Sequence, residues 1–446
     1  MALLVAAVFV QVPAGWPVES TRTAVLTVGA IALWATGILP IGVTAIAYLS
    51  LAMLLAIQPA AVVFSGFHSG AFWLVVAGMI MGVAVKHTGL GARVAWALAT
   101  RIRGSYLVIL SGVAVAATAL NFLMPSSMGR VVMLIPIVIA MADRYGFIAG
   151  RPGRAGIVMV ACAVAFIPSG SIMTALVPNL VMVGAAENLY DFTFTYAAYL
   201  LANFPVMGAL RTVAIVLLAR LLFNDTPEPA TDSSGPTPMN LREIQLAVIL
   251  GLALVLWITD AAHGIPPAWI GLGAAVVLLL PGLRFVPSNT LSEKLDYNSV
   301  FYTAGVLGMG AVISGTGLAA HLGGRLTDVL PIIENAEGTN VFLLTSLSTL
   351  LGPLVTNPAV PAVLSPLAGE LAGHTGLPVE VVLMTQVAGF SNVLFPYQAS
   401  PVLVGMSIGG IGLRSGTKMY VALTLVTLFM LVPIQSAWWQ IIGIIG

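Results

Sequence analysis

Two short polar segments interrupt an otherwise apolar chain, and each offers groups that could hold an anion. They are Pro125-Ser126-Ser127-Met128-Gly129-Arg130, which leads to Pro136, and Thr356-Asn357-Pro358, which leads to Pro366. A helix that begins at such a tip presents unpaired backbone N–H groups and the positive end of its dipole. Two such ends suit one divalent anion. The alternative is that the polar residues of both tips only cap helix ends.

Two further breaks follow the tips, at Ser169-Gly170-Ser171 and at 396–401. Unwound carbonyls, together with hydroxyl or amide oxygens, form hard-oxygen sites that suit a sodium ion. All sixteen carboxylates fall in predicted loops, the linker or helix ends, whereas a proton-coupled carrier usually needs a buried acid. Sodium is therefore the expected coupling ion, no other cofactor is expected, and the predicted ion site comprises Ser126, Ser127, Ser169, Gly170, Thr356, Asn357, Gln398 and Ala399.

Arg130 is the most informative single residue of the first tip. It lies about one helical turn beyond the polar segment, at a depth where a charge is costly and usually functional. A guanidinium fork binds a carboxylate, sulfate or sulfonate through two hydrogen bonds, and no acid lies nearby in sequence. We therefore predict that Arg130 clamps an anionic substrate. The alternative is a structural arginine bonded to backbone carbonyls of a neighbouring break.

Composition identifies the elements that must position these residues. The chain has 446 residues, of which 59% are hydrophobic and only 7% charged, whereas soluble proteins average about 25% charged residues. Apolar stretches of helix length fill most of the sequence, so we predict an all-α polytopic membrane protein. A net charge of +1 argues against a nucleic-acid partner, and the single cysteine, Cys162, excludes an intramolecular disulfide.

The breaks recur at a constant spacing. An offset of 230 residues relates Ser126 to Thr356, Pro136 to Pro366, and the 169–171 break to residues 399–401. We infer an internal repeat. The expected N-terminal repeat is 1–222, with scaffold helices at 1–104, a hairpin at 105–144 and a broken helix at 155–187. A linker at 223–242 precedes the C-terminal repeat, 243–446, with scaffold helices at 243–335, a hairpin at 340–373, a broken helix at 379–412 and a last helix at 418–443.

Loop charges predict the orientation, because cytoplasmic loops carry an excess of Lys and Arg. Only Arg22 and Arg325 fall on the external side if the 105–144 hairpin enters and leaves from the cytoplasm. The second hairpin must then enter from outside, so the two repeats have inverted topology and their tips meet near the midplane. We expect an integral protein, in a bacterial inner membrane, with a cytoplasmic N-terminus and linker and an external C-terminus.

The two tips resemble those of the divalent anion/sodium symporters, whose hairpins carry a Ser-Asn-Thr signature and an apolar run to Leu-Pro-Ile. The first copy is Ser126-Ser127-Met128 with Ile135-Pro136-Ile137, and the second is Thr356-Asn357-Pro358 with Ser365-Pro366-Leu367. Only Asn357 keeps a signature amide. The resemblance implies a homodimer, an elevator-type motion and a substrate site at the tips and second break. With Arg130 added on the chemical argument above, the predicted substrate site comprises Ser126, Ser127, Met128, Arg130, Thr356, Asn357, Pro358, Ser400 and Pro401.

The sequence thus predicts a secondary active transporter that couples sodium to the symport of a small anion, such as a dicarboxylate, sulfate or sulfonate. Alternatives are a proton-coupled anion carrier or an ion antiporter of the same superfamily, and a channel with this fold. A membrane-embedded enzyme is disfavoured, since no Asp dyad, Ser–His pair or metal-binding His-Glu-x-x-His motif lies within a predicted span. Gly78 and Gly82 fit a helix-packing pattern.

Overall fold

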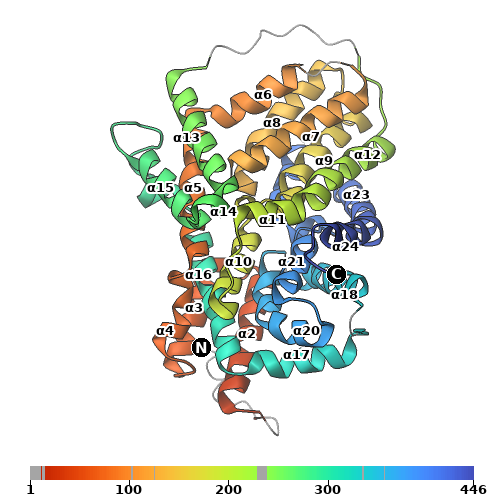
Figure 1. Cartoon of the computed structure of the whole chain (residues 1–446). Coiled ribbons are helices and arrows are strands. Elements are labelled where there is room, and N and C mark those ends of the chain that lie inside the picture. The colour runs from red at the N-terminus through yellow and green to blue at the C-terminus, as the bar shows by residue number, and fades with distance from the viewer. Residues whose placement is uncertain are drawn as a thin grey trace.

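The computed structural model describes residues 12, 16–101, 104–124, 126–228, 239–333, 336–355 and 357–446, with backbone only at 95, 96, 98–101 and 327. Every element in these ranges is helical (Figure 1), as predicted. Parts of several predictions fall outside them: residues 1–11 and 13–15 of the predicted scaffold helices, Pro125 and Thr356 of the two tips, and residues 229–238 of the predicted linker.

The N-terminal half consists of long helices joined by short 3₁₀ and π segments. Its elements are α2 (Val18–Thr36), α3 (Ile41–Leu54), α4 (Ala60–Val63), η1 (Ser65–Phe67), α5 (Gly70–Thr88), α6 (Leu90–Arg101), α7 (Tyr106–Leu123), α8 (Ser127–Arg144), α9 (Pro152–Phe166), η2 (Pro168–Ser171), η3 (Met173–Ala175), α10 (Val177–Tyr190), α11 (Tyr196–Asn203), η4 (Phe204–Leu210) and α12 (Arg211–Leu222).

The C-terminal half follows the same order. Its elements are α13 (Leu241–Ile258), α14 (Asp260–His263), α15 (Pro267–Leu279), η5 (Thr290–Lys294), α16 (Tyr297–Gly315), α17 (Leu318–Val329), α18 (Glu337–Val355), η6 (Asn357–Ala359), α19 (Val360–Leu364), η7 (Ser365–Leu367), α20 (Ala368–Thr375), α21 (Val379–Phe390), η8 (Pro396–Gln398), α22 (Ser400–Ile408), α23 (Leu413–Val426), η9 (Thr427–Leu431) and α24 (Val432–Ile441).

Helix pairs lie at 106–144 and 337–375, where hairpins were predicted, and interrupted helices lie at 152–190 and 379–408. The α7–α8 pair lies in the upper part of Figure 1 and the α18–α20 segment in the lower part. The first broken helix runs α9–η2–η3–α10 and the second runs α21–η8–α22. Each half then ends in a helix that contains a π segment, η4 or η9, so the repeated order of elements extends beyond the breaks.

Local sequence signals fix several helix ends. Ser69 caps α5, because its hydroxyl accepts a hydrogen bond from the backbone N–H of Ala71 at 3.1 Å. Gly89 ends the same helix with a φ of 82°, a left-handed conformation that glycine adopts without strain. Asn240 and Glu243 form a reciprocal capping box at the start of α13. Ser69 and Gly89 thus mark the two ends of α5, and the capping box marks the start of α13. Helix α5 forms one wall of the cavity at the first hairpin tip.

The share of each long helix that is buried distinguishes helices of the core from helices that face lipid. Seven described helices are long and apolar enough to cross a membrane, or eight if α16 and α17, which meet at 83°, form one span. The apolar window of the α9 span is 89% buried inside the protein, whereas that of α13 is only 28% buried. Apolar side chains of α13 such as Leu252 therefore face outward, as expected for a helix in contact with lipid.

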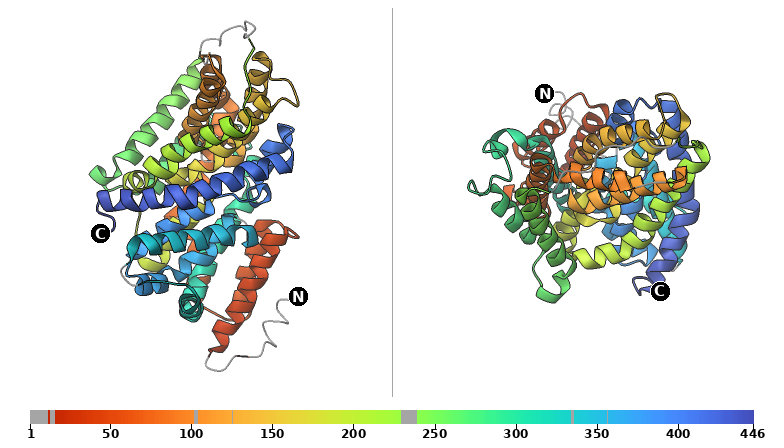
Figure 2. Two further views of the ribbon diagram at one scale, coloured as in Figure 1. Left: turned by 90° about the vertical axis from the view of Figure 1, so that its right-hand side faces the viewer. Right: turned by 90° about the horizontal axis from the view of Figure 1, so that it is seen from above.

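The two helices with π segments lie side by side at mid-height of the molecule (Figure 2). Gln435 and Trp439 of α24 both donate hydrogen bonds to the carbonyl of Ala202 in α11, at 2.6 and 3.0 Å. These bonds join the ends of the two halves.

The beginning of the predicted linker is anchored rather than free. Arg151 binds both carboxylate oxygens of Asp225, at 2.6 and 3.2 Å, and the backbone N–H of Gly153 donates to the same carboxylate at 2.9 Å. Burial opposes ionisation of Asp225, but the hydrogen bonds from Arg151, Gly153 and Thr226 and the charge of Arg151 together lower its pKa below the usual value. Residues 224–228 are thus fixed to the start of α9, while 229–238 lie outside the described residues.

Candidate functional site

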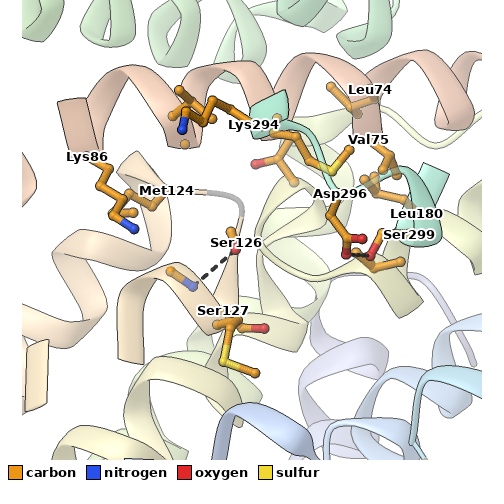
Figure 3. Close-up of a pocket in the computed structure, with 18 residues that line it drawn as sticks. Leu74, Val75, Lys86, Met124, Ser126, Ser127, Leu180, Lys294, Asp296 and Ser299 are labelled. Atoms are coloured by element: carbon orange, nitrogen blue, oxygen red, sulfur yellow. Dashed lines mark hydrogen bonds between the residues drawn. The ribbon is translucent and has the colours of Figure 1, made fainter. Parts of the chain in front are cut away.

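The first hairpin tip opens on a cavity of about 290 Å³ (Figure 3). Ser126 caps α8, because its hydroxyl accepts a hydrogen bond from the backbone N–H of Gly129 at 3.1 Å. The N-terminal residues of α8, Ser127 and Met128, line the cavity, and Thr174 of the first break lies on its wall. A predicted anion-binding helix terminus therefore faces an open space large enough for a small ligand.

Two lysines contribute positive charge to this cavity. Lys86 at the end of α5 and Lys294 of η5 both line it, and both side chains are exposed (Figure 3). Asp296 is the acid on the same wall, and it caps α16 by accepting hydrogen bonds from the backbone N–H of Asn298 and the hydroxyl of Ser299, at 3.1 and 2.5 Å. Neither lysine belongs to the ion pairs found among the described residues. The lining therefore favours an anion.

Arg130 points away from the cavity and into the first break. Its side chain is fully buried, and Nε and Nη2 donate to the carbonyl of Ala165 at 3.2 and 2.8 Å. Nη2 also donates to the carbonyl of Ala175 at 3.1 Å, and Nη1 donates to the carbonyl of Met124. Arg130 is not among the residues that line the cavity. Arg130 thus makes the contacts of the second interpretation given above, in which a structural arginine is bonded to backbone carbonyls of a neighbouring break.

The polar groups of the first break are largely bonded within it. Ser169 donates its hydroxyl proton to the carbonyl of Phe166 at 2.5 Å, and Tyr199 donates to the carbonyl of Gly170 at 2.7 Å. The amide nitrogen of Asn179 donates to the carbonyl of Ile172 at 2.8 Å, and its buried oxygen has no hydrogen-bond partner in the described part of the chain. Two of the predicted ion ligands, Ser169 and Gly170, therefore already take part in protein hydrogen bonds.

The second tip is joined to the second break by neutral amides. Asn357, fully buried, donates to the backbone carbonyl of Asn392 at 2.8 Å and accepts from the amide of Gln398 at 3.1 Å. The amide oxygen of Gln398 in turn accepts from the backbone N–H groups of Leu394 and Phe395. A side chain at Gly352 would place its Cβ 2.7 Å from both amides. This packing brings Asn357 and Gln398 together.

The two breaks lie against each other. A Cβ at Gly170 would lie only 2.7 Å from the Cβ of Ser391, so glycine allows this close approach. Arg211 of α12, also fully buried, binds the hydroxyl of Ser391 at 2.8 Å and the amide oxygen of Asn392 at 2.7 Å. In addition, α8 packs on α22 and α10 packs on α19, so each hairpin contacts the broken helix of the other half.

Comparison with known proteins identifies the family of this chain. The family described as the sodium:sulfate symporter transmembrane region matches residues 1–445. The chain belongs to the sodium:sulfate symporter family. Members of this family are membrane transporters and not enzymes, so the resemblance, the polytopic fold and the exclusion of an enzyme are confirmed.

Relatives of this sodium:sulfate symporter family member share limited identity over most of its length. A protein of Escherichia coli named L-tartrate/succinate antiporter is 23% identical over 396 residues, which are 85% of this chain and 80% of that protein. A membrane protein of Cupriavidus necator is 23% identical over 405 residues, 85% of this chain and 76% of that one. The fold resembles the crystal structure of the Alcanivorax borkumensis YdaH transporter, with a TM-score of 0.60, 15% identity, and coverage of 95% and 99% of the two chains.

The predicted site residues of this family member fall into two groups. Ser126, Ser127 and Met128 line the cavity. The described residues of the second tip and second break, which are Asn357, Pro358, Gln398, Ala399, Ser400 and Pro401, do not line it. Ser400 is exposed and Pro401 partly buried at the start of α22, while Ala399 is buried. The carbonyl of Pro358 accepts a hydrogen bond from Tyr302 at 2.7 Å. Among the described residues, the cavity at the first tip is therefore lined by the first tip and not by the second.

Sequence reasoning did not assign Lys86, Lys294, Gly78 or Gly82 to the cavity wall of this symporter-family protein. Lys86 and Lys294 were used only to predict loop orientation, and nothing in their sequence context distinguishes them from Lys418 or from the loop arginines. Gly78 and Gly82 were assigned to helix packing, yet both line the cavity, and a Cβ at Gly82 would lie 3.9 Å from the Cβ of Ser126. Their spacing along one face of α5 was the available signal.

Proposed function

We propose that this protein is a secondary active transporter that carries a small divalent or organic anion with sodium. The observation that carries the proposal is the N-terminus of α8, which opens with Ser127 and Met128 on a cavity that two lysines also line. The first N–H groups of a helix lack intrahelical acceptors and favour negative charge. The proposed substrate is a dicarboxylate, sulfate or small sulfonate.

Sodium coupling is proposed on the chemistry of the breaks. The described residues contain no cluster of three or more His, Cys, Asp or Glu side chains that could hold a metal ion. Neutral oxygens of the hairpins and unwound segments are the groups that suit sodium at bilayer depth. We place the proposed ion near Asn357 and Gln398 of the second half, where the tip meets the break without a charged group from the hairpin itself.

A second candidate is anion exchange. It is favoured by the Escherichia coli relative, whose name describes a tartrate/succinate antiporter. Exchange would use the same cavity and the same helix terminus, and would differ in needing a counter-anion in place of sodium.

The experiment is uptake into proteoliposomes. Labelled succinate, sulfate and a small sulfonate are offered with an inward sodium gradient, with choline in its place, and with unlabelled anion loaded inside. Sodium-driven accumulation supports symport, and uptake that requires internal anion supports exchange. The absence of uptake of every anion under all three conditions refutes the proposal.

The proposal also covers the membrane, the oligomeric state and the motion of the protein. We propose a bacterial inner membrane, a homodimer, and an elevator-type motion in which the hairpins and broken helices move against the remaining helices. Cysteine cross-linking across the boundary between α5 and α8, in variants lacking Cys162, tests the motion. Trapping in two different registers supports it, and a single register under all ion and substrate conditions opposes it.

A further inference from the structure

We propose that Arg130 is a built-in cation that takes the place of a bound metal ion where the first hairpin tip meets the first break. The consequence is that sodium does not bind in the first half, so any coupling ion binds only in the second. The statement about coupling rests on the proposed function, whereas the statement about Arg130 does not.

Three backbone carbonyls converge on the guanidinium from three chain segments. Met124 follows the last residue of α7, Ala165 lies in the last turn of α9, and Ala175 ends η3. The last carbonyls of a helix have no intrahelical partner and form the negative end of its dipole. Two long helices thus direct their negative ends at one positive group.

The contact set is one that a small cation also uses. Unwound carbonyls at helix ends are the usual ligands of sodium in transporters built this way. Here Nε, Nη1 and Nη2 occupy all three carbonyls, with Ala165 bound twice. A metal ion and the guanidinium therefore compete for the same oxygens, and the guanidinium is held there covalently by α8.

The charge of Arg130 has no acidic counterpart in the part of the chain that the structure describes. The ion pairs among the described residues involve Arg93, Arg151 and Arg154, but not Arg130. A buried charge without such compensation is costly, so the carbonyls must supply it. Removing Arg130 would leave these oxygens buried and without donors, in a space that fits a cation.

The second half differs at the equivalent position. The offset of 230 residues aligns Arg130 with Val360, an apolar residue that is also fully buried. The second tip is attached to its break by the amides of Asn357 and Gln398, which carry no charge. Arg211 reaches that break from α12, but it binds the side chains of Ser391 and Asn392 and no tip carbonyl. The two halves therefore differ in whether the tip brings its own cation.

Chemical rescue tests the proposal on purified full-length protein, without any transport substrate. Thermal unfolding of wild type and Arg130→Ala is followed by tryptophan fluorescence in millimolar guanidinium chloride, with choline chloride and urea as matched controls. We expect a lower unfolding temperature for Arg130→Ala, and an upward shift in guanidinium that urea, its uncharged isostere, and choline do not produce. Wild type should show no such shift. An equal response of Arg130→Ala to guanidinium and urea would overturn the proposal.

A sodium titration and a pair of longer substitutions complete the test. Sodium should stabilise wild type with a Hill coefficient of at most one, and Arg130→Ala should gain an additional sodium response. If Arg130→Ala does not fold, Arg130→Lys and Arg130→Met replace it, and the lysine variant should be the more stable. Equal stability of these two variants, or a cooperative sodium response in wild type, refutes the built-in cation. If the wild type takes up no anion while guanidinium still rescues Arg130→Ala, the transport proposal alone is refuted.

Discussion

The contact between the two breaks is sensitive to a single methyl group. In Gly170→Ala the new Cβ would lie 2.7 Å from the Cβ and 3.1 Å from the hydroxyl of Ser391. Because favourable carbon contacts lie near 3.5–4.0 Å, the breaks must separate by about 1 Å. Overpacking of this kind costs about 1–3 kcal/mol. The cost rises if Ser391 moves off Arg211, since a hydrogen bond to a charged group contributes about 1.5–3 kcal/mol.

Thermal unfolding in detergent measures this effect, with Gly251→Ala as the matched control. Gly251 lies within α13, and a Cβ there meets no atom within 4 Å. We expect a clearly lower unfolding temperature for Gly170→Ala, and an unchanged or slightly higher one for Gly251→Ala, because glycine in a helix costs about 0.5–1 kcal/mol relative to alanine. Adding Ser391→Gly should recover part of the loss by removing the clashing carbon. If Gly170→Ala unfolds at the same temperature as Gly251→Ala, the close approach of the breaks is wrong.

Three further predictions concern the cavity, the second tip and the linker. Lys86→Gln and Lys294→Gln should each raise the KM for a divalent anion about 1.4- to 5-fold, because an exposed charge contributes about 0.2–1 kcal/mol. Added salt should reduce the difference in KM between variant and wild type, because it screens exposed charges. An unchanged KM would show that these lysines do not belong to the site. Asn357→Ala should lower the unfolding temperature, since each buried polar group left unpaired costs about 1–3 kcal/mol, and equal stability would contradict the amide network. Folding lowers the pKa of Asp225, so its ion pair with Arg151 stabilises the protein above the unfolded pKa of about 3.9 and loses this effect as pH falls through the folded pKa. Asp225→Asn should therefore flatten the acid side of a plot of stability against pH. A profile identical to that of the wild type would refute this.

The helical class, the hairpins and the breaks could be predicted because they leave local signals. Proline and small polar residues end helices through backbone geometry, and apolar runs of membrane length are unambiguous. The 230-residue offset rests on the same signals, since it compares helix interruptions. The anchoring of Asp225 was missed because its partner Arg151 lies 74 residues away. A polar, proline-rich segment carries no local sign of such a contact.

Residue roles at the site were less predictable, because they depend on which way a side chain points. Arg130 lies one turn beyond the tip, where it could reach either the cavity or the break, and sequence alone left both open. Arg130 binds the break and not the cavity because the carbonyls of Met124, Ala165 and Ala175 can replace the water that a guanidinium loses on burial. Lys86 and Lys294 reach the cavity because η5 folds back toward the end of α5, a contact between segments more than 200 residues apart.

The contacts of Glu187 cross the boundary along which the proposed motion would occur. Glu187 of α10, within the first broken helix, accepts hydrogen bonds from the hydroxyl of Ser69 and the backbone N–H of Gly70, both at 3.1 Å. Its carboxylate therefore caps the start of α5, where negative charge is favoured. Tyr190, one turn later on α10, instead donates to the carbonyl of Ser365 in the second hairpin at 2.7 Å. Because α10 is bonded to both sides, an elevator motion must break the Glu187 contacts or carry the start of α5 with it. Hydrogen bonds to a charged group contribute about 1.5–3 kcal/mol each, so this pair is large enough to set the relative populations of two states.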